Sequence, residues 1–297
     1  MPVNRDFNQI VTMDQATRKK RPADFQGSAD YVQSLERGLA VIRAFGSQSP
    51  AMTLSEVSTL TGLSRAVVRR LLLTLAHLGY VRQDGRRFAL TPRVLELGYG
   101  FLGSQAYPEI ARPAMEALSR RVNESCSLGV LDGEDVVYMQ RVSVRKVMTV
   151  TLGIGARLPA FCTSMGRVLL AGLDDPTLAA WLATLEPRKV SEHTCTDLQK
   201  LRRLIRRARS DGHAYVEQEL ERGLCSIAVP LRNPAGTVVA ALNVGMPYRD
   251  EARARALGEV LPALHDTALE IERLAGPRFP ADPGSASRPR GKLPKSA

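Results

Sequence analysis

The sequence predicts an α+β protein with two domains, and three observations support this fold class. The chain has 297 residues, 44% of them hydrophobic, which is enough for about two domains that each bury a core. Its net charge of +11 is unevenly distributed, because residues 31–100 hold nine Lys and Arg against four Asp and Glu, whereas residues 101–275 hold 22 against 21. The local pattern also changes, from three helices and a hairpin to mixed hairpins and helices. A basic block beside a nearly neutral domain is typical of a polyanion-binding module with a second function attached.

Composition excludes several classes of protein. No stretch approaches the ~18 apolar residues that a membrane span needs, and the N-terminal segment lacks the apolar core of a signal peptide. The four cysteines, Cys126, Cys162, Cys195 and Cys225, are far apart, which argues against a zinc ribbon and a disulfide framework. We therefore expect a protein of the reducing cytoplasm with no membrane partner.

Both ends of the chain have the composition of disordered segments. Residues 1–30 are polar, contain a basic run at 18–22 and show no apolar periodicity, so we expect a flexible basic arm. Residues 276–297 are basic and rich in Pro, Gly and Ser, so we expect a disordered tail.

The first domain, residues 31–91, begins with three predicted helices. The first spans 31–46 and is amphipathic, since its apolar residues recur at helical spacing, namely Val32, Leu35, Leu39, Ile42 and Phe45. Thr53 and Glu56 have the spacing of a capping box for a second helix, which Gly62 ends. Ser64 can cap a third helix that runs to about Leu78. Leu54, Val57 and Leu60 of the second helix, and Leu71, Leu72, Leu75 and Leu78 of the third, supply the apolar faces.

Two short strands follow, at 80–82 and 88–90, around an Asp84–Gly85 turn. This order predicts a winged helix-turn-helix, in which a tight glycine turn presents the second helix of the motif to the major groove of DNA. Arginines on that helix have the length to reach guanine edges, and those on the hairpin reach the backbone or the minor groove. The candidate DNA contacts on these elements are Thr53, Ser64, Arg65, Ala66, Arg69, Arg70, Thr74, Arg82, Arg86 and Arg87.

Pro92 favours a helix start, so we assign residues 92–107 to a linker helix between the domains. The second domain, residues 108–275, shows helical patterns at 108–123, 166–172, 176–185, 197–211 and 250–274. Its strand patterns lie at 126–131, 135–142, 147–152, 214–219, 225–232 and 237–245, with hairpin turns at 132–133 and 233–236. Mixed hairpins and helices around one sheet indicate an α+β sensor-like domain.

The second domain shows little machinery for catalysis. Ser164 lacks the G-x-S-x-G elbow, the four histidines do not cluster, and no phosphate-binding glycine motif is present. We therefore expect no enzyme activity, no catalytic residue, no metal and no cofactor. Two alternatives stay open, namely an enzyme with Cys162 or Cys225 as nucleophile, and a redox or metal sensor built from the cysteines and His193.

One segment has the chemistry of a binding site for a small anion. Residues 155–166 end a loop and open an apolar helix, so that Thr163 and Ser164 lie where free amides and hydroxyls converge. A second run of small residues, 223–228, precedes a strand that can face it. Few polar groups on an apolar floor suit a small carboxylate, and the competing interpretation is a capped helix with a tight turn.

The sequence resembles the IclR family of bacterial transcriptional regulators over residues 31–275. The resemblance rests on YVQSLERGLAVIRAF, TLSEVSTLTGLSRAVVRRLLLTLAHLGYV, RFALTPRVLELG, GARLPAFCTSMGRVLLA, QELERGLCSIAVPL and VVAALNV. The forms SRAVVRRLLLTL, LPAFCTSMGRVLLAG and QELERGLCSIAVP look most like the subgroup that controls protocatechuate, 4-hydroxybenzoate and β-ketoadipate catabolism.

The resemblance implies an N-terminal winged helix-turn-helix, joined by the linker helix to a GAF-like α/β effector-binding domain. It implies a homodimer or tetramer on palindromic double-stranded operator DNA in the nucleoid, with RNA polymerase as a further candidate partner. The implied effector is a small organic acid, here an aromatic-pathway acid such as protocatechuate, 4-hydroxybenzoate or 3-oxoadipate. A different small organic acid is the alternative within the family.

The resemblance also implies the effector site. Its loop at Thr163, Ser164, Met165 and Gly166 holds the effector carboxylate, and the remaining lining positions are Val216, Leu224, Ser226, Asn243 and Gly245. Val216 stands where some members have an acidic residue and Met165 where they have a small one, which favours an aromatic acid over very small oxo-acids. We add Arg141 and Glu217 as residues that would restore polarity if they point inward.

Overall fold

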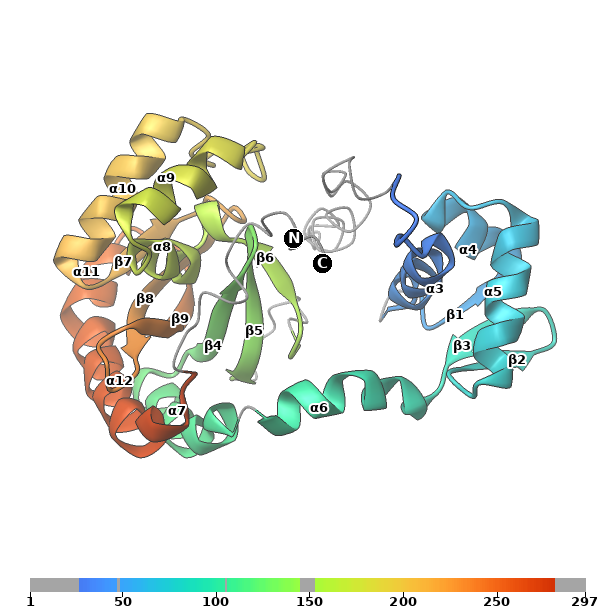
Figure 1. Ribbon diagram of the computed structural model, residues 1–297. Helices are drawn as coiled ribbons and strands as arrows, with labels where there is room; N and C mark the ends of the chain where they lie inside the picture. Colours follow the sequence, from blue (N-terminus) through green and yellow to red (C-terminus); the bar gives the residue numbers. More distant parts are fainter. Residues whose placement is uncertain (1–26, 47–48, 105, 145–152, 281–297) are drawn as a thin grey trace, which may run out of the picture. The chain divides into compact units, whose positions relative to one another are not determined.

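The computed structural model describes residues 27–46, 49–104, 106–144 and 153–280. Contacts divide the chain after Ser104 into two compact units, which we describe separately (Figure 1). The predicted strand at 147–152, residues 1–26 of the arm and residues 281–297 of the tail lie outside the described residues. Among the helices that the structure describes, none is long and apolar enough to cross a membrane.

The N-terminal unit contains the three predicted helices and the predicted hairpin. Its elements are α3 (Gln33–Ala44), β1 (Ala51–Thr53), α4 (Leu54–Thr61), α5 (Arg65–His77), β2 (Val81–Asp84) and β3 (Arg87–Leu90). The strands form an antiparallel sheet in the order β1-β3-β2. Strand β1 was not predicted, because its three residues are too few to show an alternating pattern, and it forms by pairing with β3.

Local chemistry fixes the turn between α4 and α5. Thr53 and Glu56 form the predicted capping box, and the two hydrogen bonds that Glu56 accepts from Thr53 lower the pKa of its carboxyl group. Gly62 ends α4 in the left-handed conformation, with φ at 67°, which a residue with a Cβ rarely adopts. Ser64 then caps α5 by accepting a hydrogen bond from the Val67 amide. The helix-turn-helix is therefore built largely by these short-range contacts.

The predicted apolar set at 31–46 is only partly buried. Phe45 is 9% exposed and Ile42 packs against the core, but the most buried residue of α3, Val41, is not in the set, and three members are solvent-exposed, namely Val32, Leu35 and Leu39. Leu60 and Leu78, from the predicted apolar faces of the second and third helices, are about half exposed. The side of α3 that carries Val41 and Phe45 packs against α4 and α5 within this unit.

The predicted linker begins with a short 3-10 helix, η1 (Pro92–Leu95), and continues as α6 (Glu96–Ser104). Thr91 caps η1, and Pro92 occupies its first turn as expected. The next helix, α7, starts at Tyr107. Large apolar side chains on η1 and α6 are exposed, namely Leu95, Leu97, Tyr99 and Phe101.

The second unit is built around a six-stranded antiparallel sheet with the order β6-β5-β4-β9-β8-β7. Its strands are β4 (Ser125–Asp132), β5 (Asp135–Val142), β6 (Arg157–Pro159), β7 (Ala214–Glu217), β8 (Leu224–Arg232) and β9 (Val238–Pro247). Its first helices are α7 (Tyr107–Val122), α8 (Ser164–Ala171), α9 (Asp175–Thr184) and α10 (Leu198–Asp211). The C-terminal helical stretch comprises α11 (Ala252–Arg255), a π-helical segment (Ala256–Val260) and α12 (Leu261–Ala275). These elements match the predicted ones closely, apart from the short strand β6, which lies in the predicted loop 155–166.

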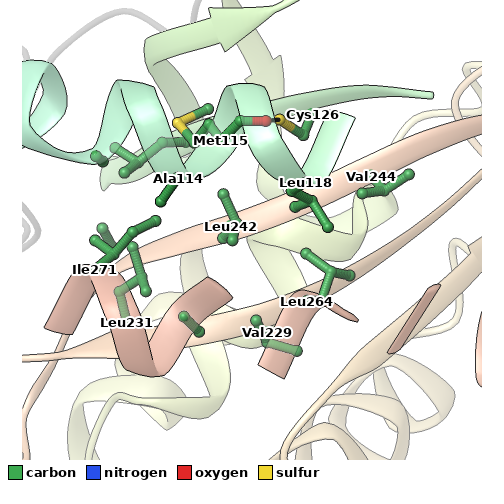
Figure 2. Close-up of a cluster of buried hydrophobic side chains, with 14 of the residues drawn as sticks. Ala114, Met115, Leu118, Cys126, Val229, Leu231, Leu242, Val244, Leu264 and Ile271 are labelled. Atoms are coloured by element: carbon green, nitrogen blue, oxygen red, sulfur yellow. Dashed lines mark hydrogen bonds between the residues drawn. The ribbon is translucent and has the colours of Figure 1, made fainter. Parts of the chain in front are cut away.

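Each face of this sheet carries its own hydrophobic core. On one face α7 and α12 pack over β4, β8 and β9, with Met115, Leu118, Leu242 and Leu264 at the centre (Figure 2). On the other face lie α8, α9 and α10 (Figure 1). Trp181 of α9 is buried in this second core, and its indole N–H donates a hydrogen bond of 2.9 Å to the Gly133 carbonyl in the β4–β5 turn.

The first residues of the expected disordered tail belong to the folded unit. Gly276–Arg278 form a 3-10 turn, η4, directly after α12. Phe279 is 7% exposed, and its ring centroid lies 4.9 Å from that of Tyr107. An aromatic residue among prolines is easily taken for part of a linker, and only its contact with α7 shows that it contributes to the core.

Candidate functional sites

The helix-turn-helix exposes most of the predicted DNA contacts. Ser64, Arg65, Ala66, Arg69, Arg70 and Thr74 are exposed on α5 and its cap, whereas Val68, Leu72 and Leu75 of the same helix are buried. Arg82, Arg86 and Arg87 are exposed on the hairpin. The helix therefore presents one basic face to solvent while its other face anchors it in the unit.

Three of the predicted DNA contacts also have structural roles, and one of them is Ser64, the cap of α5. The Thr53 hydroxyl donates a 2.9 Å hydrogen bond to the Glu56 carboxylate within the capping box. The Arg87 guanidinium donates a 3.0 Å hydrogen bond to the Ala51 carbonyl, which ties the hairpin to β1. Arg65, Arg69 and Arg70 are exposed on α5, and none of their guanidinium groups has a partner among the described contacts.

In the second unit, strand register brings the predicted effector residues onto one face of the sheet. Val216 on β7 lies opposite Ser226 on β8, and Ser226 lies opposite Gly245 on β9. Asn243 is two residues along β9 from Gly245 and therefore shares its face, as Leu224 shares the face of Ser226. This face packs against α8, because the Ser164 and Ser226 hydroxyls form a 2.8 Å hydrogen bond.

The N-terminus of α8 lies directly over this face. Thr163 caps the helix by accepting a hydrogen bond from the Gly166 amide, and its hydroxyl donates to the Pro159 carbonyl. Ser164 and Met165 are buried, with 0% and 1% exposure. The partial positive charge of the helix end and the Ser164 hydroxyl thus face a part of the sheet that carries a few polar side chains.

Small residues allow α8 to approach the sheet closely. A Cβ at Gly166 would overlap the backbone of Ala160, and a Cβ at Gly172, the C-cap, would come within 2.5 Å of Val238. Met165 Sδ lies 3.2 Å from where a Cβ at Gly129 on β4 would stand. At its C-terminal end, Arg209 of α10 donates hydrogen bonds to the carbonyls of Ala171 and Leu173. The helix is therefore held at both ends.

Asn243 carries a polar atom that the protein leaves unsatisfied. Its side chain is 7% exposed, and its Oδ1 atom is buried without a hydrogen-bond partner among the described residues. Ser127 on β4 lies opposite Asn243, and it accepts a 3.3 Å hydrogen bond from Arg141 on β5. Arg141 thus belongs to the same face, as predicted, whereas Ser127 was missed, although alternation along β4 would have placed it there.

Glu217 does not belong to this face. It lies opposite Cys225, which belongs to the core under α7 and α12, so its side chain lies on the other side of the sheet from Ser164. The expectation that Glu217 restores polarity at the effector site is therefore wrong. The neighbour Val216 takes the inward position, because successive residues of a strand alternate between faces.

The cysteines are poorly suited to nucleophilic or redox chemistry. All four are free and buried. Burial raises the pKa of Cys126 to about 12 and also raises that of Cys225, so their thiolate forms are disfavoured. Within the described residues no three His, Cys, Asp or Glu side chains are grouped so as to hold a metal ion.

Comparison with known proteins agrees with this architecture. Residues 34–85 match the IclR helix-turn-helix domain model, and residues 101–273 match the model of the C-terminal domain of bacterial transcriptional regulator IclR. The Pca regulon regulatory protein of Pseudomonas putida is 41% identical over 261 residues, which cover 86% of this chain and 90% of that protein.

Two solved structures give the same result. A crystal structure from Rhodococcus sp. RHA1, assigned as a transcriptional regulator, is 49% identical, with a TM-score of 0.71 over 82% of this chain and 99% of that chain. An IclR homologue from Microbacterium hydrocarbonoxydans, solved in complex with 4-hydroxybenzoate, is 26% identical, with a TM-score of 0.70 over 81% of this chain and 98% of that one. The winged N-terminal unit, the sheet packed against α8 and these matches along nearly the whole described chain show that the protein belongs to the IclR family of bacterial transcriptional regulators.

Proposed function

We propose that this protein is a DNA-binding transcription factor of the cytoplasm that senses a small hydroxylated aromatic carboxylate and regulates genes of aromatic-acid catabolism, of the protocatechuate and β-ketoadipate type. The observation that carries the proposal is the buried Oδ1 of Asn243 on the sheet face beneath α8, which has no hydrogen-bond partner within the described part of the chain. A carboxylate cannot satisfy this acceptor, but a phenolic hydroxyl can, because it donates a hydrogen bond. Two relatives support the assignment, since one regulates a Pca regulon and another binds 4-hydroxybenzoate.

The remaining groups of the site suit the other end of such a molecule. The N-terminus of α8 and the paired hydroxyls of Ser164 and Ser226 can hold a carboxylate. Arg141, which already contacts Ser127, supplies a cation on the same face. Met165 and Val216 provide apolar surface for the ring between the two ends. We therefore favour 4-hydroxybenzoate and protocatechuate over 3-oxoadipate, which has no phenolic hydroxyl.

Calorimetric titration tests this assignment through a matched pair of ligands. We expect 4-hydroxybenzoate to bind about tenfold more tightly than benzoate, because benzoate leaves the Asn243 acceptor unpaired. In an Asn243→Leu variant this difference should disappear, since leucine of similar size has no acceptor. Pyruvate, glyoxylate and 3-oxoadipate are titrated in the same way as candidate effectors without an aromatic ring. Equal binding of benzoate and 4-hydroxybenzoate by the wild-type protein would overturn the proposed role of Asn243.

We further propose that the protein acts as a homodimer, or as a tetramer built from two such dimers, on a palindromic operator, where it meets RNA polymerase. The exposed apolar residues of α3 and of the linker support a second copy as their partner, because exposed apolar clusters of this kind mark interaction sites. Leu35 is 62% exposed and Tyr99 is 76% exposed. A protein that reads two half-sites gains affinity from linking two modules.

A charged double variant, Leu35→Glu with Leu39→Glu, should lower the oligomeric state that sedimentation equilibrium measures, from dimer to monomer or from tetramer to dimer. It should also weaken binding to a palindromic operator by about 100-fold, because the two recognition helices are no longer linked. Leu60→Glu is the control, since Leu60 is 51% exposed on α4 and lies outside this surface. An unchanged association state in the double variant would place the interface elsewhere.

A further inference from the structure

A second cleft lies at the edge of the sheet, away from the site under α8. It has a volume of about 590 Å³, within the range of small-molecule sites. Its walls come from α8, α10, the edge strand β7 and the C-terminal helical stretch, and none of the residues that we assign to the aromatic acid lines it. Glu217, which the sequence assigned to the effector site, lines this cleft instead. Because β7 pairs only with β8, the cleft borders the free edge of the sheet.

Hydrogen-bond donors are in excess in this cleft. Arg167 is 3% exposed and donates two 2.7 Å hydrogen bonds from one nitrogen to Glu219, but its Nε atom is buried with no partner among the described residues. The Tyr215 hydroxyl is also buried; it makes no hydrogen bond of ordinary geometry within the described residues, but it lies beside the Cys225 thiol and the Glu217 carboxylate. A buried donor that lacks an acceptor costs free energy, so Arg167 Nε favours a ligand or solvent rich in acceptors.

The cations of the cleft outnumber the carboxylates available to neutralise them. Arg207 is paired with Asp211, as Arg167 is with Glu219. Lys200 on α10 and Arg253 on α11 line the cleft without any described ion pair, and Glu217 is the remaining carboxylate. The guanidinium of Arg253 lies 5.8 Å from the centroid of the Tyr215 ring, which presents a cation over an apolar surface.

The backbone beside the cleft is also unusual. The helical stretch that carries Arg253 continues directly into the π-helical segment Ala256–Val260, and Leu257 of this segment lines the cleft. Such π segments are rare and occur frequently at functional sites, because the wider turn changes the direction of side chains. Arg253 and Arg255 both precede this segment on α11, where Arg253 lines the cleft and Arg255 is held by Glu124 and by the Val122 carbonyl.

We propose that this cleft is a second ligand site, which binds a small di- or tricarboxylate between Lys200 and Arg253, with Arg167 at its base. An anion with more than one carboxylate matches two unpaired cations from separate elements and supplies an acceptor for the buried Arg167 Nε. A monocarboxylate such as 4-hydroxybenzoate leaves one of the two cations unused. The site is independent of the proposed effector site, and its test does not require that the effector be known.

The test is calorimetric titration of the full-length protein with citrate and with succinate, and acetate, which lacks a second carboxylate and a ring, serves as the monocarboxylate control, for which we expect no saturable binding. We expect one saturable citrate site per chain, weakened at least about fivefold in Arg253→Gln and in Lys200→Gln. Arg249→Gln is the matched control, because Arg249 is exposed nearby and does not line the cleft, so citrate binding should be unchanged. Asn243→Leu should also leave citrate binding intact, which separates this site from the one under α8.

Three results would overturn the proposal. The first is the absence of saturable binding of citrate and of succinate in the millimolar range. The second is an equal loss of affinity in Arg249→Gln and Arg253→Gln, because the attraction would then depend on net charge alone. Competition by inorganic phosphate that is as strong as that by succinate would likewise contradict selectivity for carboxylates. Thermal unfolding of each variant shows whether a loss of binding comes from a loss of structure.

Discussion

Replacing Gly166 by alanine will destabilise the second unit by about 3 kcal/mol or more, although alanine usually stabilises a helix relative to glycine by about 1 kcal/mol. The reason is steric, since a Cβ at this position would overlap the backbone of Ala160, which cannot rotate away as a side chain can. Either α8 must move off the sheet or the preceding turn must open. Both changes disturb the Ser164–Ser226 contact, so effector binding should be lost together with stability.

Urea unfolding followed by circular dichroism measures this effect. Gly258→Ala is the control, because a Cβ at Gly258 meets no atom within 4 Å, and we expect its stability to be unchanged or slightly higher. Operator binding by the N-terminal unit should survive in the Gly166 variant at temperatures where the second unit stays folded. A Gly166→Ala protein as stable as wild type would show that the turn at Ala160 yields easily.

The second large effect is expected on α5. Arg65→Ala and Arg69→Ala should each weaken binding to the operator by about 5- to 150-fold, which corresponds to roughly 1–3 kcal/mol for a lost contact with a base. The loss should be specific to the operator, because base contacts carry sequence information whereas phosphate contacts do not. Effector binding should remain at its wild-type strength, since both residues lie in the N-terminal unit.

Fluorescence anisotropy against an operator obtained by in vitro selection, and against random DNA, separates the two roles. Arg82→Gln and Arg86→Gln on the hairpin should weaken both DNAs alike and reduce the salt dependence by about one counterion each. Arg120→Ala, an exposed arginine in the second unit, is the control for net charge. If Arg65→Ala lowers affinity for random DNA as much as for the operator, its contact is with phosphate.

The elements that the sequence predicts correctly are those whose structure is determined by short-range contacts. The capping box at Thr53, the cap at Ser64 and the left-handed Gly62 each involve residues within three positions of one another, and all occur as expected. The hairpins of the second unit are also predictable from local residues. The Asp132–Gly133 turn, for example, fixes the pairing of β4 with β5. These local signals are sufficient to place α5 and α8, the two helices on which our functional proposals rest.

Errors arose where the outcome depends on distant partners. The apolar stripe of α3 has helical spacing, but spacing alone does not decide which of two apolar faces packs inward. Glu217 was placed on the wrong side of the sheet, since its orientation depends on register with Cys225 rather than on its own neighbourhood. The unpaired Oδ1 of Asn243 and the cleft beside β7 could not be predicted, because both result from several strands and helices coming together.

The position of Trp181 gives the protein an optical reporter of its own. It is the chain's single tryptophan, it is 4% exposed, and its indole nitrogen is bonded to the turn between β4 and β5. The tryptophan emission of the protein therefore comes from the second unit alone. We expect it to remain unchanged when the winged unit unfolds. A red shift would report the separation of α9 from the sheet, so the melting of one unit can be followed within the intact, unlabelled chain.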